Sequence, residues 1–109
     1  MIFIKQGVVL ANLQDDWLLE PACVLDEILH EKNLGHAWIT SGIEGNHNTN
    51  SYHYAAGQVR GQAIDLRLPG NAKQNEEILL EMKRRLPKWR TILEGDHYHV
   101  QRFKTGTNF

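Results

Sequence analysis

The sequence contains one cysteine, Cys23, among its 109 residues. A lone thiol cannot form a disulfide within the chain, and it cannot supply the several cysteines of a thiolate-bound structural zinc site. The sequence also lacks any run of about 20 consecutive apolar residues, the length that a membrane-spanning helix requires. The stability of the fold must therefore come from the packing of its own core, to which a bound metal can add.

Neither sign of charge dominates, because 12 basic and 13 acidic residues give a formal net charge of −1. Such a chain has no general attraction for phosphate backbones or anionic lipid surfaces. We therefore expect no nucleic-acid partner and no insertion into membranes. The amino terminus is apolar only over residues 1–4, since Lys5 and Gln6 interrupt it before an apolar segment of signal-peptide length can form.

The length and a hydrophobic share of 41 % predict one domain, covering residues 1–109, with a core of its own. Apolar residues recur at helical spacing in two segments, about 21–34 and 72–86, which we predict to be helices. Strands or extended segments are predicted at residues 2–10, 37–40, 62–68, 89–93 and 97–103. Short turns between strands and helices predict an α+β domain in which a small antiparallel sheet is flanked by helices.

Histidines and carboxylates gather in two parts of the sequence. His53 is followed by Asp65, and further along the chain Asp96, His97 and His99 lie within four positions. Imidazole nitrogen and carboxylate oxygen are good zinc ligands, and a catalytic zinc keeps three protein ligands and one open position. On a strand, His97 and His99 would point to the same side. A His-x-His pair alone is more often a pair of exposed or core-edge residues, so the clustering with carboxylates is the informative feature.

Two other kinds of site fit these residues less well. A serine nucleophile at Ser41 or Ser51 would lack the Gly-x-Ser-x-Gly turn that exposes such a serine. A cupin-type metal site also uses His-x-His, but it needs a glutamate and a further histidine downstream. Neither residue type occurs after His99.

The ordered combination of motifs resembles the D-alanyl-D-alanine carboxypeptidase-like zinc peptidases. The motifs are Ser51-x-His53, Gly61-x-Ala63-x-Asp65 and Asp96-His97-x-His99-Val100-Gln101, preceded by Ile39-Thr40-Ser41-Gly42. This group includes the VanX and VanY type dipeptidases and carboxypeptidases, and phage endolysins that cut peptidoglycan stem peptides. The resemblance covers residues 38–101 and implies a Hedgehog/DD-peptidase-like fold.

By motif position, the resemblance implies that Zn²⁺ is held by His53, Asp65 and His99. Asp96 matches the acidic general base of the family, three residues before the last ligand. His97 matches a histidine that lies near the oxyanion in some members. Glu94 is a second candidate base, because related proteins vary in the distance between the acid and the last ligand.

Two features depart from the pattern of the family. Eleven residues, 54–64, separate His53 from Asp65, which is more than the family usually has. Longer loops cost little free energy, but the insertion leaves His47 as an alternative ligand. The arginine that many relatives carry after Ser-Gly is absent, so we expect substrate binding by Ser51 and Arg60, with Arg67 as an alternative to Arg60.

These features predict a zinc-dependent peptidase that uses metal-activated water to hydrolyse an amide bond in peptidoglycan stem peptides. One alternative is a non-catalytic, zinc-stabilised module that binds peptidoglycan or protein, and another is an interaction domain without metal. From the missing signal and the resemblance, we expect synthesis in a bacterial cytoplasm and action at the cell wall. A phage or prophage gene fits this expectation.

Overall fold

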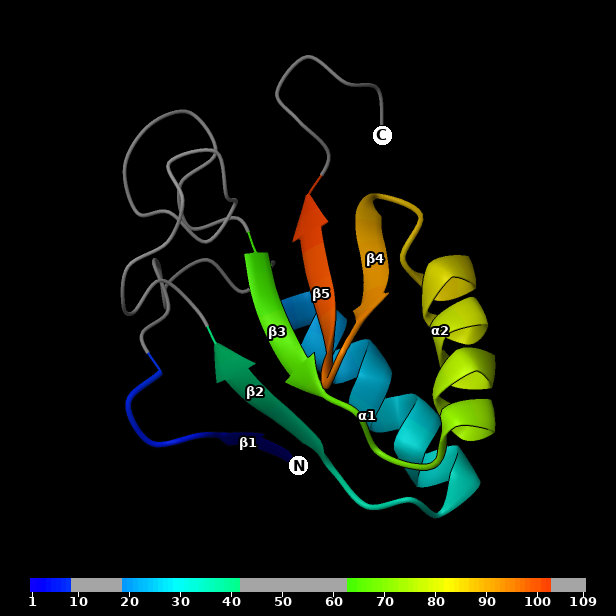
Figure 1. The fold of residues 1–109 in the computed structure, drawn as a ribbon, viewed down its shortest axis with the longest axis horizontal. Coiled ribbons are helices and arrows are strands. Elements are labelled where there is room, and N and C mark those ends of the chain that lie inside the picture. The colour runs from blue at the N-terminus through cyan, green and yellow to red at the C-terminus, as the bar shows by residue number, and fades with distance from the viewer. Residues whose placement is uncertain (9–18, 42–62, 103–109) are drawn as a thin grey trace.

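The described residues, 1–8, 19–41 and 63–102 of the computed structural model, form one five-stranded sheet with two helices on one of its faces (Figure 1). The strands are β1 (Ile2–Ile4), β2 (Ala37–Ser41), β3 (Ala63–Arg67), β4 (Trp89–Glu94) and β5 (His97–Arg102). The helices are α1 (Glu20–Lys32) and α2 (Ala72–Arg85). These bounds confirm both predicted helices and place a strand in each predicted extended segment, although β1 is shorter than predicted.

The order of the strands across the sheet is β1-β2-β3-β5-β4. β1 runs parallel to β2, while the other neighbouring pairs are antiparallel. The chain passes through α1 between β1 and β2, and parallel strands require a long crossover of this kind. The sheet is therefore mixed: the prediction of an α+β domain is confirmed, and the prediction of an antiparallel sheet is wrong at the β1–β2 pair.

Local sequence signals set the ends of both helices. Pro21 occupies the first turn of α1, where its missing N–H costs no hydrogen bond, and Asn33 ends that helix with a left-handed φ of 58°. At the start of α2, Asn71 and Gln74 form a reciprocal capping box with hydrogen bonds of 2.8 and 3.0 Å. Within the described residues, neither helix is long and apolar enough to span a membrane.

The core lies between the helices and one face of the sheet. Its fully buried members include Leu25, Ile28 and Leu29 of α1, Ile78 and Met82 of α2, and Ile39, Ile64, Leu66, Tyr98 and Val100 of the strands. Because side chains alternate along a strand, Asp65 faces away from this core, as do His97 and His99 on either side of Tyr98. In the part of the chain that the structure describes, no helix covers this second face (Figure 1). We call it the open face of the sheet.

Tyr98 anchors β5 to α2 from inside the core. Its hydroxyl donates a hydrogen bond of 2.7 Å to the backbone carbonyl of Asn75, and burial raises the pKa of the phenol well above its usual range. We expect Tyr98→Phe to lower the free energy of unfolding by about 1 kcal/mol, because the ring still packs and only the hydrogen bond is lost. Urea denaturation measures the change. Tyr98→Leu should cost more, and an unchanged midpoint in Tyr98→Phe would contradict a stabilising hydrogen bond.

Candidate functional site

The open face of the sheet brings together the predicted site residues of β3 and β5. Asp65 in β3 is directly opposite His99 in β5, and Arg67 is directly opposite His97. β4 flanks β5 on the side away from β3, and its last residue, Glu94, lies directly opposite His97. Since neighbouring strands are only about 4.8 Å apart, these side chains form one cluster. The prediction that His97 and His99 share a face is confirmed.

The closest contact in the cluster joins Asp65 and His99. Asp65 Oδ1 lies 3.0 Å from His99 Nδ1, and the two side chains are only 15 % and 12 % exposed. The other ring nitrogen of His99, Nε2, lies 2.6 Å from Gln101 Oε1. An amide oxygen accepts but cannot donate, so Gln101 holds the proton on Nε2 and leaves Nδ1 turned toward the carboxylate.

This geometry suits two of the ligand positions of a zinc ion. Ligand atoms about 2.0–2.1 Å from a tetrahedral zinc lie about 3.3 Å from each other, close to the 3.0 Å between Asp65 Oδ1 and His99 Nδ1. Gln101 would act as the outer partner that fixes the ring of a ligating histidine. Within the described residues, no group of three His, Cys, Asp or Glu side chains is arranged to hold a metal. The described residues therefore bring together two candidate ligands, Asp65 and His99.

The remaining predicted residues lie in the undescribed part of the chain. The predicted third ligand His53, its alternative His47, and the predicted substrate residues Ser51 and Arg60 all fall within residues 42–62. Asp65, Asp96, His97 and His99 are the predicted site residues that the structure brings together.

His97 is surrounded by three carboxylates. Its Nδ1 lies 2.8 Å from Asp96 Oδ1, while its Nε2 lies 3.2 Å from Glu94 Oε1 and 3.7 Å from Asp65 Oδ2. Partial burial acts to lower the pKa of His97, but the hydrogen bond to Asp96 and the charges of Asp65 and Glu94 outweigh it and raise the pKa. The charged imidazolium form is therefore favoured at this position.

A similar balance holds at His99. Burial acts to lower its pKa, whereas the hydrogen bonds to Asp65 and Gln101 raise it more, and the net pKa is raised. A proton on Nδ1 removes the repulsion between the nitrogen lone pair and the carboxylate of Asp65. A metal cation bound by both side chains would also offset that repulsion.

The two candidate acids take different positions. Asp96 stands in the turn between β4 and β5 with its side chain 97 % exposed, and its contact is with the ring of His97. Its hydrogen bond to that ring lowers the pKa of Asp96. Glu94 ends β4 on the open face with its side chain 48 % exposed, and its Oε1 lies 3.9 Å from His99 Nδ1. Glu94 is therefore the acid that faces the Asp65–His99 pair.

Sequence reasoning gave Gln101 no role. The signal was present, because a period of two places residues 97, 99 and 101 on one face of a strand. Glutamine is a poor metal ligand, and its part here is to orient the ring of His99.

Comparison of the chain with protein-family models, with curated proteins and with solved structures finds no match. The resemblance to the zinc peptidases thus rests on the motifs in the sequence alone.

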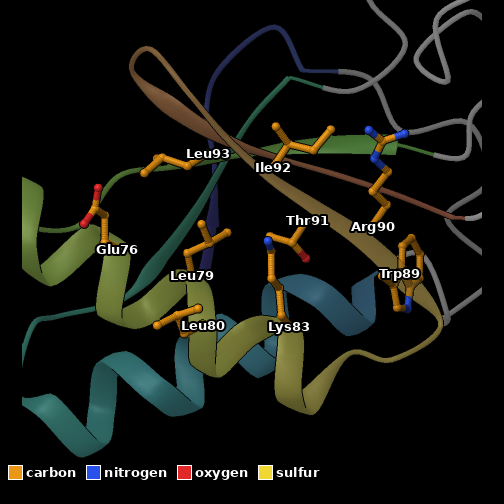
Figure 2. Close-up of a pocket in the computed structure, with 9 residues that line it drawn as sticks. All are labelled: Glu76, Leu79, Leu80, Lys83, Trp89, Arg90, Thr91, Ile92 and Leu93. Carbon is orange, nitrogen blue, oxygen red and sulfur yellow. The ribbon is translucent and has the colours of Figure 1, made fainter.

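A separate hollow of about 690 Å³ lies between α2 and β4 (Figure 2). Leu79 and Leu80 of α2 face Trp89, Thr91 and Leu93 of β4 across it, and its lining includes no histidine. Glu76, Lys83 and Arg90 also line the hollow, so its lining is partly charged, and it includes none of the residues that form the cluster on the open face.

Thr91 is expected to be a destabilising residue in this region. Its Oγ1 is buried and has no hydrogen-bond partner among the described residues, and such a group costs about 1–3 kcal/mol in desolvation. We expect Thr91→Val to raise the free energy of unfolding by about 1 kcal/mol, as measured by urea denaturation, because valine has nearly the same shape. The matched control is Thr40→Val, which loses a hydrogen bond to the backbone oxygen of Asp65 and should not stabilise. Destabilisation by Thr91→Val would contradict this expectation.

Proposed function

We propose that this chain is a zinc-dependent peptidase that hydrolyses an amide bond in peptidoglycan stem peptides, on a domain of the Hedgehog/DD-peptidase-like fold. The observation that carries the proposal is the 3.0 Å approach of Asp65 and His99, with His97 and two further carboxylates beside them on the open face. His53, two residues after Ser51 in the sequence motif, supplies the third ligand. The mixed sheet with its helices on one face is compatible with this fold.

When bound, zinc would polarise the scissile carbonyl and lower the pKa of water to about 7. The remaining chemistry falls to side chains of this chain. A carboxylate takes a proton from the attacking water and returns it to the leaving amine. His97, whose pKa its carboxylate neighbours raise, turns its Nε2–H from Glu94 to the carbonyl oxygen and donates a hydrogen bond as negative charge develops there.

Two residues compete for the role of the general base. The sequence motif favours Asp96, whereas the distances favour Glu94, whose Oε1 lies 3.9 Å from His99 Nδ1. We assign the base to Glu94 and give Asp96 the task of orienting His97 through their 2.8 Å contact.

The proposal is tested by incubating the zinc-loaded chain with purified stem peptides and identifying the products by mass spectrometry. We expect cleavage that disappears in chelator and returns when zinc is added back. One equivalent of bound zinc with intact peptides would instead support the zinc-stabilised binding module. Folding that is unchanged in chelator, with no stoichiometric zinc, would support an interaction domain without metal.

A further inference from the structure

The hollow between α2 and β4 lies beside an exposed apolar side chain (Figure 2). Leu80 of α2 lines the hollow and is 68 % exposed. One exposed leucine alone is ordinary on a protein surface. Here, however, Leu79 and Leu93 line the same space of about 690 Å³ and are half-buried. An apolar projection and a recess with apolar side chains in its walls therefore lie side by side on one face of the molecule.

The outer edge of β4 borders the same hollow. β4 is the last strand of the described sheet and pairs there only with β5, while its residues Thr91 and Leu93 line the hollow. Such an edge can take up another chain unless a helix or a loop covers it. β4 has six residues, whereas β1 at the opposite edge has three. Among the described strands, β4 therefore offers the longer edge to a partner.

Opposite charges flank the two leucines of α2. Glu76 lies three and four positions before Leu79 and Leu80, and Lys83 lies four and three positions after them. This spacing aligns the four side chains along one side of the helix, and all four line the hollow. Within the described residues, neither Glu76 nor Lys83 takes part in an ion pair. We call these four residues the α2 stripe, which runs from acidic through apolar to basic.

We propose that this face joins two copies of the chain in a dimer, with the α2 stripes packed antiparallel across a two-fold axis. A two-fold interface matches a surface with itself, so each contact between two residues is repeated in reverse. The axis passes between Leu79 and Leu80, which places Glu76 of each copy beside Lys83 of the other. Each Leu80 enters the hollow of the other copy, where its apolar surface is removed from water.

The order of residues in the α2 stripe favours a second copy of this chain as the partner. Because the stripe is symmetric about its midpoint in position and opposite in charge at its ends, an antiparallel copy brings unlike charges together at both ends. A parallel copy would bring like charges together, which disfavours that arrangement. The same antiparallel packing lays the helix of the other copy along the outer edge of β4, and a helix is one of the elements that cover such edges.

This inference goes beyond the proposed peptidase function and does not rest on it. Asp65, His97 and His99 do not line the hollow, so the proposed interface is separate from the cluster on the open face. The dimer is therefore tested by measuring the mass of the particle in solution, without any assay of catalysis.

Sedimentation equilibrium of the intact chain, over a range of concentrations, measures the association. We expect a reversible equilibrium between monomer and dimer. Leu80→Ala should weaken it by at least about 100-fold, because the two-fold axis repeats each lost apolar contact. Leu80 is exposed in the single chain, so this variant should keep its fold, which circular dichroism checks. Ile4→Ala shortens another exposed side chain, in β1, and should leave the dimer unchanged.

Charge reversal tests the pairing across the axis. Glu76→Lys and Lys83→Glu should each weaken the dimer by about 10-fold, because each variant places like charges side by side at both ends of the stripe. An equimolar mixture of the two variants should associate as tightly as the unmodified chain, because unlike charges then meet again at both ends. Glu77→Lys makes the same charge change on α2 outside the hollow and should have no effect.

Three results would overturn the proposal. A chain that stays monomeric at every concentration would leave the hollow to another occupant, such as an extended segment of a different protein. A dimer that is unchanged in Leu80→Ala and in both charge variants would have its interface elsewhere. Single charge variants that dissociate but do not associate again on mixing would contradict the antiparallel pairing of the α2 stripes.

Discussion

His99→Ala is expected to bind zinc at least about 100-fold more weakly than the unmodified chain. Loss of an outer-shell partner alone typically costs a zinc site 10- to 100-fold in affinity, and His99 is proposed as a direct ligand through Nδ1, 3.0 Å from Asp65 Oδ1. Asp65→Ala should show a loss of the same size. Competition with a chelator of known affinity measures the change, and elemental analysis measures the zinc retained after purification.

Two further variants make this result specific. Gln101→Ala should weaken zinc binding by about 10-fold, because the ring of His99 loses the acceptor 2.6 Å from its Nε2 while the ligand itself remains. His30→Ala removes an exposed histidine from α1, among the helices on the other face of the sheet, and should leave zinc content unchanged. Full zinc content in His99→Ala would contradict the assignment of this residue as a ligand.

Glu94→Gln is expected to keep its zinc and to lose turnover by about 100- to 10,000-fold, the usual contribution of a general acid–base residue. The amide keeps the size of the side chain at the end of β4 but cannot accept the proton of the attacking water. The loss should fall on kcat, with KM for the stem peptide little changed. Single-turnover hydrolysis and zinc content, measured on the same preparation, separate this effect from loss of the metal.

Asp96→Asn is the comparison that decides between the two acids. Its side chain is 97 % exposed and touches the cluster through the ring of His97, so we expect a smaller loss of turnover than in Glu94→Gln. A larger loss of turnover in Asp96→Asn than in Glu94→Gln would instead assign the general base to Asp96, as the sequence motif alone suggests.

Much of the fold followed from periodicity in the sequence. Apolar spacing predicted α1 and α2, and alternation predicted that His97 and His99 share a face on β5. The parallel pairing of β1 with β2 could not be predicted in this way. Three residues of β1 pair with a strand more than thirty positions away, and nothing in so short a segment specifies its partner or its direction.

The candidate site was predictable in its residue types and less so in its geometry. Glu94 and Asp96 look equivalent in the sequence, because both lie within a few positions of His99. They differ because residue 94 is the last of β4 and faces the cluster, whereas residue 96 stands in the turn toward solvent. The register between β3 and β5 places Asp65 opposite His99. This register is a property of the assembled sheet, and no local sequence pattern encodes it.

The position of a bound zinc ion is the most direct test of the central claim. Anomalous diffraction at the zinc absorption edge, from crystals grown with zinc, should show one peak about 2.0–2.2 Å from an Asp65 carboxylate oxygen and from His99 Nδ1. A peak elsewhere on the molecule, or no peak while Asp65 and His99 keep their direct 3.0 Å contact, would contradict the claim that these two residues form the core of a zinc site.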